Sequence, residues 1–149
     1  MPSGEICDRA VIVVQRDDTV LEAAKLMRQH RVRDVQVVED RDGERVPIGI
    51  ITDHDLVVEI MAPELDHMVI TVGDIMVQEL FTVKDSTGIS DAIQYMRSKT
   101  VRRLPIVDEH GGLVGILTLD DVLELVAEEM LDLAKLVGYE LKKEMRHRR

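Results

Sequence analysis

The chain has 149 residues, of which 45% are hydrophobic, enough for one compact domain or two small ones with a buried core. Its 29 acidic and 19 basic residues give a net charge of -10, which disfavours general binding to nucleic acids. The one cysteine excludes an intrachain disulfide and a cysteine-built zinc site, and two tyrosines and one phenylalanine are too few to stack nucleic-acid bases or sugar rings.

The apolar runs are short, and none is long enough to span a bilayer. The first residues also lack the basic region and apolar stretch of a secretory signal. We therefore expect a soluble, cytoplasmic protein without a membrane partner.

Two series of predicted elements follow one another along the chain. β-Branched runs bounded by turn residues predict strands, and apolar residues three and four apart predict amphipathic helices. The first series runs strand, helix, strand, strand, helix, at residues 11–14, 20–29, 35–38, a run ending at 49–51, and 53–60. The second series has the same order, at residues 81–83, 89–98, 104–107, a run ending at 115–117, and from 119 onward.

The two series are copies of one β-α-β-β-α unit. A shift of 69 positions places Ala23 on Ala92 and Met27 on Met96. The shift is three residues shorter where Gly49 matches Gly115, because the first copy has three extra loop residues. A unit of about 60 residues buries a limited fraction of its surface alone. We therefore expect the two copies to pack against each other about a pseudo-two-fold axis.

The expected fold class is α+β, with the two repeats in one module and an extended C-terminal helix. We assign repeat one to residues 5–63, a linker to 64–72, repeat two to 73–130, and a helix extension with a basic tail to 131–149. Packing of this kind leaves two equivalent clefts between the repeats, and such interfaces are favoured positions for ligands.

The sharpest repeated motif is Gly-apolar-apolar-Thr-x-x-Asp, which occurs at residues 49–55 and 115–121. Threonine followed by aspartate three residues later is typical of a capping box at the start of a helix. The alternative is a nucleotide site, because a strand end that feeds a helix N-terminus can hold a phosphate. Thr52 and Thr118 would then lie against phosphate, and Asp55 and Asp121 would accept hydrogen bonds from ribose hydroxyls.

Arginines near the start of each second strand provide positive charge in an acidic chain. Arg102 and Arg103 are either solvated surface residues or phosphate ligands. The first copy has Arg33, but Asp34 stands where the second copy has Arg103. The two pockets should therefore be unequal, and we expect the second to bind more tightly.

Both copies resemble cystathionine-β-synthase-type (CBS) domains, and the chain resembles small stand-alone proteins made of one tandem CBS pair, a Bateman module. The resemblance spans residues 5–130. It rests on five segments of the second copy, which have weaker counterparts in the first. The segments are 75–76, 82–83, the helix carrying Ala92 and Met96, 101–107 and 115–118.

The resemblance implies a non-catalytic regulatory module that binds AMP, ADP, ATP or S-adenosylmethionine between the repeats. It implies that the motif aspartates hold ribose, that the motif threonines contact phosphate, and that the first strands contact adenine. His54 stands where related proteins often have arginine. The candidate ligand-binding residues are Val13, Val14, Arg33, Thr52, His54, Asp55, Thr82, Val83, Arg102, Arg103, Leu104, Pro105, Thr118, Asp120 and Asp121.

Other functions are less well supported by the residues. The five histidines are scattered without the spacing of metal ligands, and no catalytic motif accompanies Cys7, so we expect neither a metal site nor an enzyme. The principal alternative to a regulatory module is a structural homodimer or scaffold with empty pockets. A nucleotide-processing enzyme is a third hypothesis.

The C-terminal helix extends beyond what the repeat requires. Its apolar stripe packs either on its own module or in a homodimer seam. The stripe comprises Leu123, Val126, Met130, Ala134, Val137 and Leu141. We expect a homodimer that changes its assembly or its contacts with a regulated protein when ligand binds.

Overall fold

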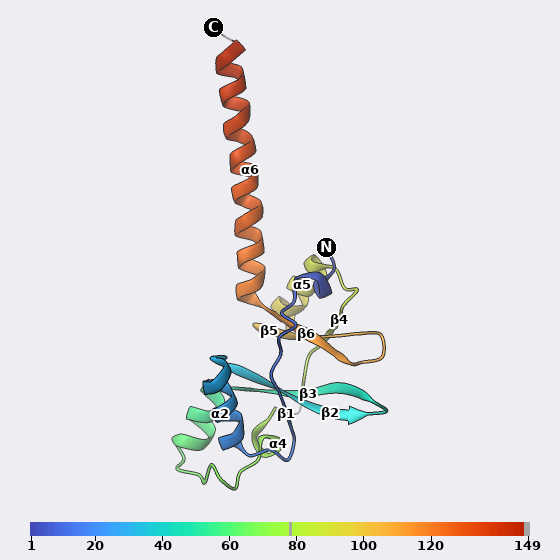
Figure 1. The fold of residues 1–149 in the computed structure, drawn as a ribbon, viewed down its shortest axis with the longest axis vertical. Helices are drawn as coiled ribbons and strands as arrows, with labels where there is room; N and C mark the ends of the chain where they lie inside the picture. The colour runs from blue at the N-terminus through green and yellow to red at the C-terminus, as the bar shows by residue number, and fades with distance from the viewer. Residues whose placement is uncertain (78, 148–149) are drawn as a thin grey trace. The chain divides into compact units, whose positions relative to one another are not determined.

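The computed structural model describes residues 1–77 and 79–147, so Arg148 and Arg149 of the predicted basic tail lie outside the described residues. The chain forms two compact units, residues 1–117 and residues 118–149. The first unit holds both three-stranded sheets, and the second consists of the long helix α6, Leu119–His147 (Figure 1). The α+β prediction is confirmed.

Repeat one forms the sheet β1-β2-β3, in which β1 is parallel and β3 antiparallel to β2. Its elements are β1 Val13–Gln15, α2 Val20–His30, β2 Asp34–Arg41, β3 Glu44–Thr52, α3 Asp53–Leu56 and the π-helix η1 Val57–Met61. Repeat two forms the sheet β4-β5-β6. Its elements are β4 Val83–Lys84, α5 Ile89–Lys99, β5 Arg103–Val107 and β6 Leu113–Thr118.

The helix predicted at residues 53–60 is divided. After the single turn of α3, the amide of Ala62 bonds to the carbonyl of Val57, five residues back. This wider π register is rare, and it leaves Ile60 buried while Val57 and Met61 are exposed.

The core of repeat one lies between α2 and its sheet. Thr19 caps α2 by accepting a hydrogen bond from the amide of Glu22. The apolar face of the helix then buries Ala23 and Met27 against strand residues that include Val37 and Ile51. In repeat two, α5 buries the matching Ala92 and Met96.

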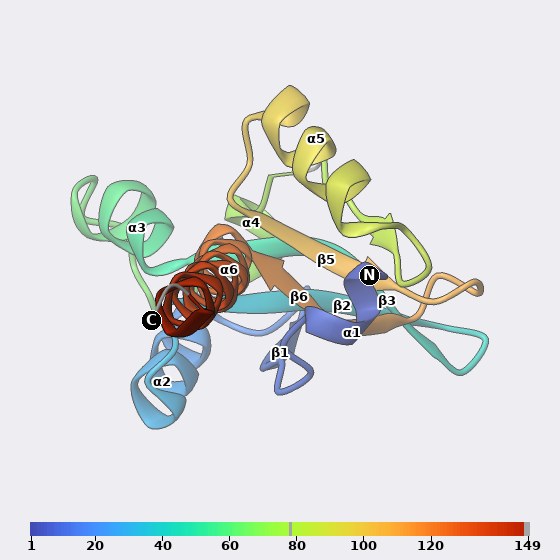
Figure 2. The same cartoon turned by 90° about the horizontal axis from the view of Figure 1, so that it is seen from above.

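Two short helices that the sequence analysis did not predict join the repeats. They are α1, Ser3–Ile6, and α4, Val72–Ile75, which occupy equivalent positions in the two copies. Each donates two backbone amides to carbonyls of the other repeat, at equivalent residues and at 2.7 to 3.0 Å. Both short helices are labelled in Figure 2. The four bonds run from Ser3 to Thr87, from Gly4 to Asp85, from Val72 to Asp18, and from Gly73 to Arg16. Each repeat is therefore completed by backbone that precedes the other.

The exchanged segments explain the glycine of the repeated motif. Asp8 and Ile116 exchange two backbone hydrogen bonds, and a Cβ atom on Gly115 would stand 2.5 Å from the carbonyl oxygen of Asp8. A Cβ atom on Gly49 would likewise stand 2.9 Å from the sulfur of Met76, the residue equivalent to Cys7. Glycine is required at position 115 because the backbone at Asp8 lies too close to Gly115 to leave room for any side chain.

Among residues 1–77 and 79–147, no helix combines the length and the apolar character that crossing a membrane requires.

Replacement of Gly115 by alanine should destabilise the protein by about 1–3 kcal/mol, because the added methyl group must displace the backbone of Asp8. Urea unfolding followed by circular dichroism measures the change. Gly138→Ala in α6 is the control, because a Cβ atom there meets nothing within 4 Å and alanine is the better helix former, so this variant should not be destabilised. Equal stabilities of the two variants would contradict this account of the motif glycine.

Candidate ligand site at the junction of the repeats

The motif of repeat one forms a capping box at the start of α3. The hydroxyl of Thr52 accepts a hydrogen bond from the amide of Asp55 at 3.2 Å, and Oδ2 of Asp55 accepts one from the amide of Thr52 at 2.9 Å. Both side chains are half-buried. The other carboxylate oxygen of Asp55 has no partner among the described residues, so it is available to a ligand hydroxyl.

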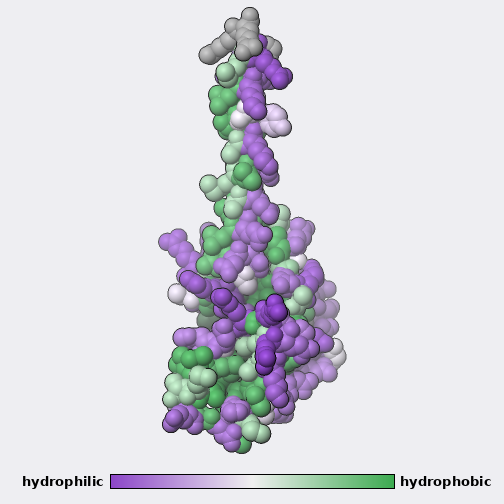
Figure 3. Space-filling model, turned by 60° about the vertical axis from the view of Figure 1, so that its left-hand side comes forward, coloured by the Kyte–Doolittle hydropathy of each residue, from purple (hydrophilic) through white to green (hydrophobic). Residues whose placement is uncertain are grey.

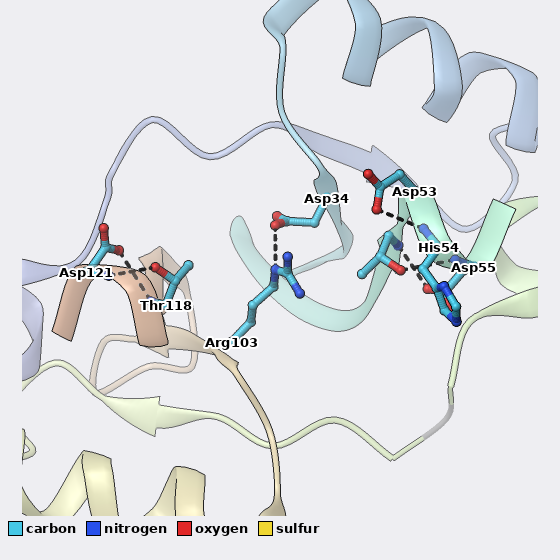
Figure 4. Close-up of polar contacts among 8 residues, drawn as sticks. Asp34, Asp53, His54, Asp55, Arg103, Thr118 and Asp121 are labelled. Carbon is cyan, nitrogen blue, oxygen red and sulfur yellow. Dashed lines mark hydrogen bonds and ion pairs between the residues drawn. The ribbon is translucent and has the colours of Figure 1, made fainter. Parts of the chain in front are cut away.

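The motif of repeat two has the same local geometry within the second unit. The amide of Asp121 donates to the hydroxyl of Thr118 at 3.1 Å, and the amide of Thr118 donates to Oδ2 of Asp121 at 3.3 Å (Figure 4). The capping interpretation of the sequence is therefore realised at both motifs, and a ligand would use the atoms that the caps leave open.

A third pair with the same spacing opens α4. The amide of Thr71 donates to Oδ2 of Asp74 at 3.0 Å. This bond, together with one donated by the hydroxyl of Thr71, lowers the pKa of Asp74 below its usual value. Thr71 does not follow a glycine and a strand as Thr52 and Thr118 do, so the spacing alone marks a helix start and not a ligand site.

A salt bridge brings repeat two to the motif of repeat one. Nε of Arg103 donates to Oδ2 of Asp34 at 2.8 Å, and the two side chains are 31% and 20% exposed (Figure 4). Asp34 faces Thr52 in the register of β2 and β3, and the carbonyl of Arg33 accepts a hydrogen bond from the amide of Asp53. Charged groups of both repeats therefore lie at the end of β3 where the motif begins.

Arg103 and Asp34 occupy equivalent positions in the two copies, 69 residues apart. The difference between aspartate in one copy and arginine in the other makes the two repeats unequal. The same difference allows the two residues to form a salt bridge between the repeats. Two arginines at these positions would repel each other across the pseudo-two-fold axis.

The remaining predicted residues differ in accessibility. Val13 and Val14 line a surface cavity of about 570 Å³ together with Gln15, Asp18, Val38, Asp40, Gly43 and Arg45. Thr82 and Val83 are half-buried, whereas Leu104 and Pro105 are fully buried. The side chains of Arg33, His54, Arg102 and Asp120 are exposed. The cavity is not lined by the motif threonine and aspartate of repeat one.

Gln36 is a residue of interest that the sequence analysis did not select. It lies in β2, is fully buried, and neither polar atom of its side chain has a hydrogen-bond partner among the described residues. Buried amides are rarely left unpaired in proteins. A polar residue in the apolar run of residues 35–38, where repeat two has Pro105, was the available signal.

The described residues contain no group of three or more histidine, cysteine, aspartate or glutamate side chains that could hold a metal ion.

Comparison with known proteins identifies the family. The model of the CBS domain matches residues 4–62 and again residues 72–128, so the chain belongs to the CBS domain family as a tandem pair. An uncharacterised protein of Methanopyrus kandleri is 38% identical over 122 residues, which are 82% of this chain. The chain spans 61% of the length of that relative.

Solved structures of CBS pairs share the fold. Hypoxic Response Protein I of Mycobacterium tuberculosis, crystallised with two coordinated zinc ions, is 29% identical with a TM-score of 0.71, over 83% of this chain and 98% of that one. A CBS domain pair in complex with 5'-methylthioadenosine and S-adenosyl-L-methionine is 22% identical with a TM-score of 0.71, over 85% of this chain and 99% of that one.

The salt bridge between the repeats should couple the stabilities of its two partners. In a double-mutant cycle of Arg103→Ala and Asp34→Ala, we expect a coupling energy of about 0.5–1 kcal/mol, because the pair is partly screened by solvent. The control pair is Arg41 and Glu39, whose side chains are 59% and 43% exposed and should couple more weakly. A zero coupling energy for Arg103 and Asp34 would contradict the contact.

Proposed function

We propose that the protein is a non-catalytic regulatory module that binds an adenosine-containing ligand, such as AMP, ADP, ATP or S-adenosylmethionine, in the clefts between its CBS repeats. The observation that carries the proposal is the bond of Arg103 to Asp34, because it places charge from both repeats beside the Thr52 and Asp55 motif. A ligand there would contact both copies and respond to their relative position.

The proposed roles follow from the groups that the caps leave open. The free oxygen of Asp55 accepts hydrogen bonds from the ribose hydroxyls. Thr52 can still donate its hydroxyl proton to a phosphate oxygen, because its bond with Asp55 uses the oxygen only as an acceptor. Arg33 and Arg103 supply positive charge for a phosphate, and Arg103 retains guanidinium nitrogens beyond the one bonded to Asp34.

Adenine is expected to contact the first strands, at Val13 and Val14 in repeat one and at Thr82 and Val83 in repeat two. In repeat two, Thr118 and Asp121 take the roles of Thr52 and Asp55, and Arg102 supports phosphate binding. His54 and Asp120 lie within their motifs, and the buried Leu104 and Pro105 belong to β5, which pairs with the first strand of repeat two. The adenosine ligands in the 22% identical CBS pair support this ligand class.

A ligand can change the state of the module only if it binds one state more tightly than the other. We propose that closure of the repeats around the ligand alters either the homodimer or the contacts with a regulated protein. A single nucleotide is compatible with the acidic chain because local arginines, and not the net charge, meet its phosphate.

A scaffold with empty pockets is the second candidate. It is favoured by one observation: the motif threonines and aspartates form the same kind of helix cap as Thr71 and Asp74, which do not belong to the repeated motif.

Isothermal titration calorimetry with AMP, ADP, ATP and S-adenosylmethionine separates the two candidates. Asp55→Ala and Asp121→Ala should each weaken binding of the preferred ligand by at least about tenfold, which is about 1.4 kcal/mol. Asp74→Ala is the matched control, because it removes the acid of a similar helix cap outside the motif and should leave the affinity unchanged. In thermal unfolding, a ligand at about 100 times its Kd should stabilise the protein by about 2.7 kcal/mol.

Absence of any heat signal or stabilisation with all four compounds would favour the scaffold. Equal loss of affinity in the Asp74 variant and the motif variants would show that the motif aspartates act only as caps.

A further inference from the structure

The long helix α6 carries an exposed apolar stripe along one side. Its side chains are spaced by three and four residues, each is at least 41% exposed, and Figure 3 shows hydrophobic residues gathered along one flank of the helix. The stripe comprises Leu123, Val126, Met130, Leu133, Val137, Leu141 and Met145. At a rise of 1.5 Å per residue it is about 33 Å long.

An apolar stripe of this length requires a partner. Helical stability in proteins comes mainly from packing of an amphipathic face, and a helix in water without such packing is marginal. From Leu123 to Val137 the spacing alternates between three and four, the pattern of a two-helix seam.

The charges of α6 indicate which partner covers the stripe. Residues 119–134 contain six acidic side chains and no basic one. Residues 135–146 contain four basic side chains, Lys135, Lys142, Lys143 and Arg146, against Glu140 and Glu144. The helix is thus acidic in its first half and basic in its second, so its surface is complementary to itself only when two copies run in opposite directions.

We propose that α6 pairs with α6 of a second copy of this chain as an antiparallel two-helix seam. Val126 belongs to the stripe, Glu140 lies along its edge, and Leu133 lies midway between them in the sequence. In an antiparallel pair centred near Leu133, Val126 of each copy faces the partner subunit's Glu140, and the acidic half of each helix lies beside the basic half of the other. A parallel pair would instead set the acidic halves against each other.

This inference names the surface and direction of the homodimer proposed above and does not depend on ligand binding. Light scattering with size-exclusion chromatography on the full chain tests the surface. The combined variant Met130→Glu and Val137→Glu should weaken the dimer by at least tenfold, because it places four carboxylates in the seam. Tyr139→Glu is the matched control: Tyr139 is 73% exposed on the opposite side of α6, so the dimer should persist.

Disulfide cross-linking tests the direction. A chain with Val126→Cys mixed with a chain with Glu140→Cys should form a mixed disulfide, whereas Val126→Cys alone should not cross-link to itself. The unmodified chain, whose one cysteine is the buried Cys7, is the background control.

Four results would overturn the inference. Self-linking of Val126→Cys without the mixed product would show a parallel pair. A dimer that persists in the variant with Met130→Glu and Val137→Glu would show that the chain forms a homodimer through another surface. Cross-linking of Leu133→Cys to the exposed Met61→Cys would show that repeat one covers the stripe. A monomeric wild-type chain would remove both the seam and the homodimer.

Discussion

Each repeat is closed by backbone that belongs to the other. Four backbone hydrogen bonds join α1 to the second repeat and α4 to the first, at equivalent residues, so neither repeat is complete without the segment that precedes its partner. A unit of about 60 residues buries too little surface to be comfortably stable alone, and this exchange adds backbone pairing to the packing that joins the repeats. The motif glycines follow from it, because the exchanged chain passes directly over Gly115.

The candidate ligand site depends on the same arrangement. Because the exchange fixes the repeats against each other, Arg103 of one copy can reach Asp34 of the other and lie beside the motif of repeat one. The capping boxes at Thr52 and Thr118 hold the motif side chains in place and leave one oxygen of each aspartate open. A helix cap and a ligand site are therefore compatible uses of the same residues, which is why the spacing alone could not distinguish them.

Periodic patterns predicted the regular elements well. The apolar spacing that placed helices at residues 20–29 and 89–98 corresponds to α2 and α5, and the duplicated order of elements determined the fold class. The single turns α1 and α4 were missed because four residues carry no period, and the π turn of η1 was missed because register is decided by packing. The pairing of Arg103 with Asp34 was not predicted either. The repeat shows that these residues occupy equivalent positions in the two copies, but it does not show that they are in contact. The unpaired amide of Gln36 depends on tertiary surroundings that no local pattern records.

The central claim is that an adenosine-containing ligand binds between the repeats at the strand ends that carry the motifs. Hydrogen–deuterium exchange of the full chain, with and without a saturating ligand chosen from AMP, ADP, ATP and S-adenosylmethionine, tests it most directly. The account predicts slowed exchange at the amides of Val13 and Val14 and across residues 52–55 and 118–121. Protection confined to other segments, or unchanged exchange at both motifs under ligand saturation, would contradict it.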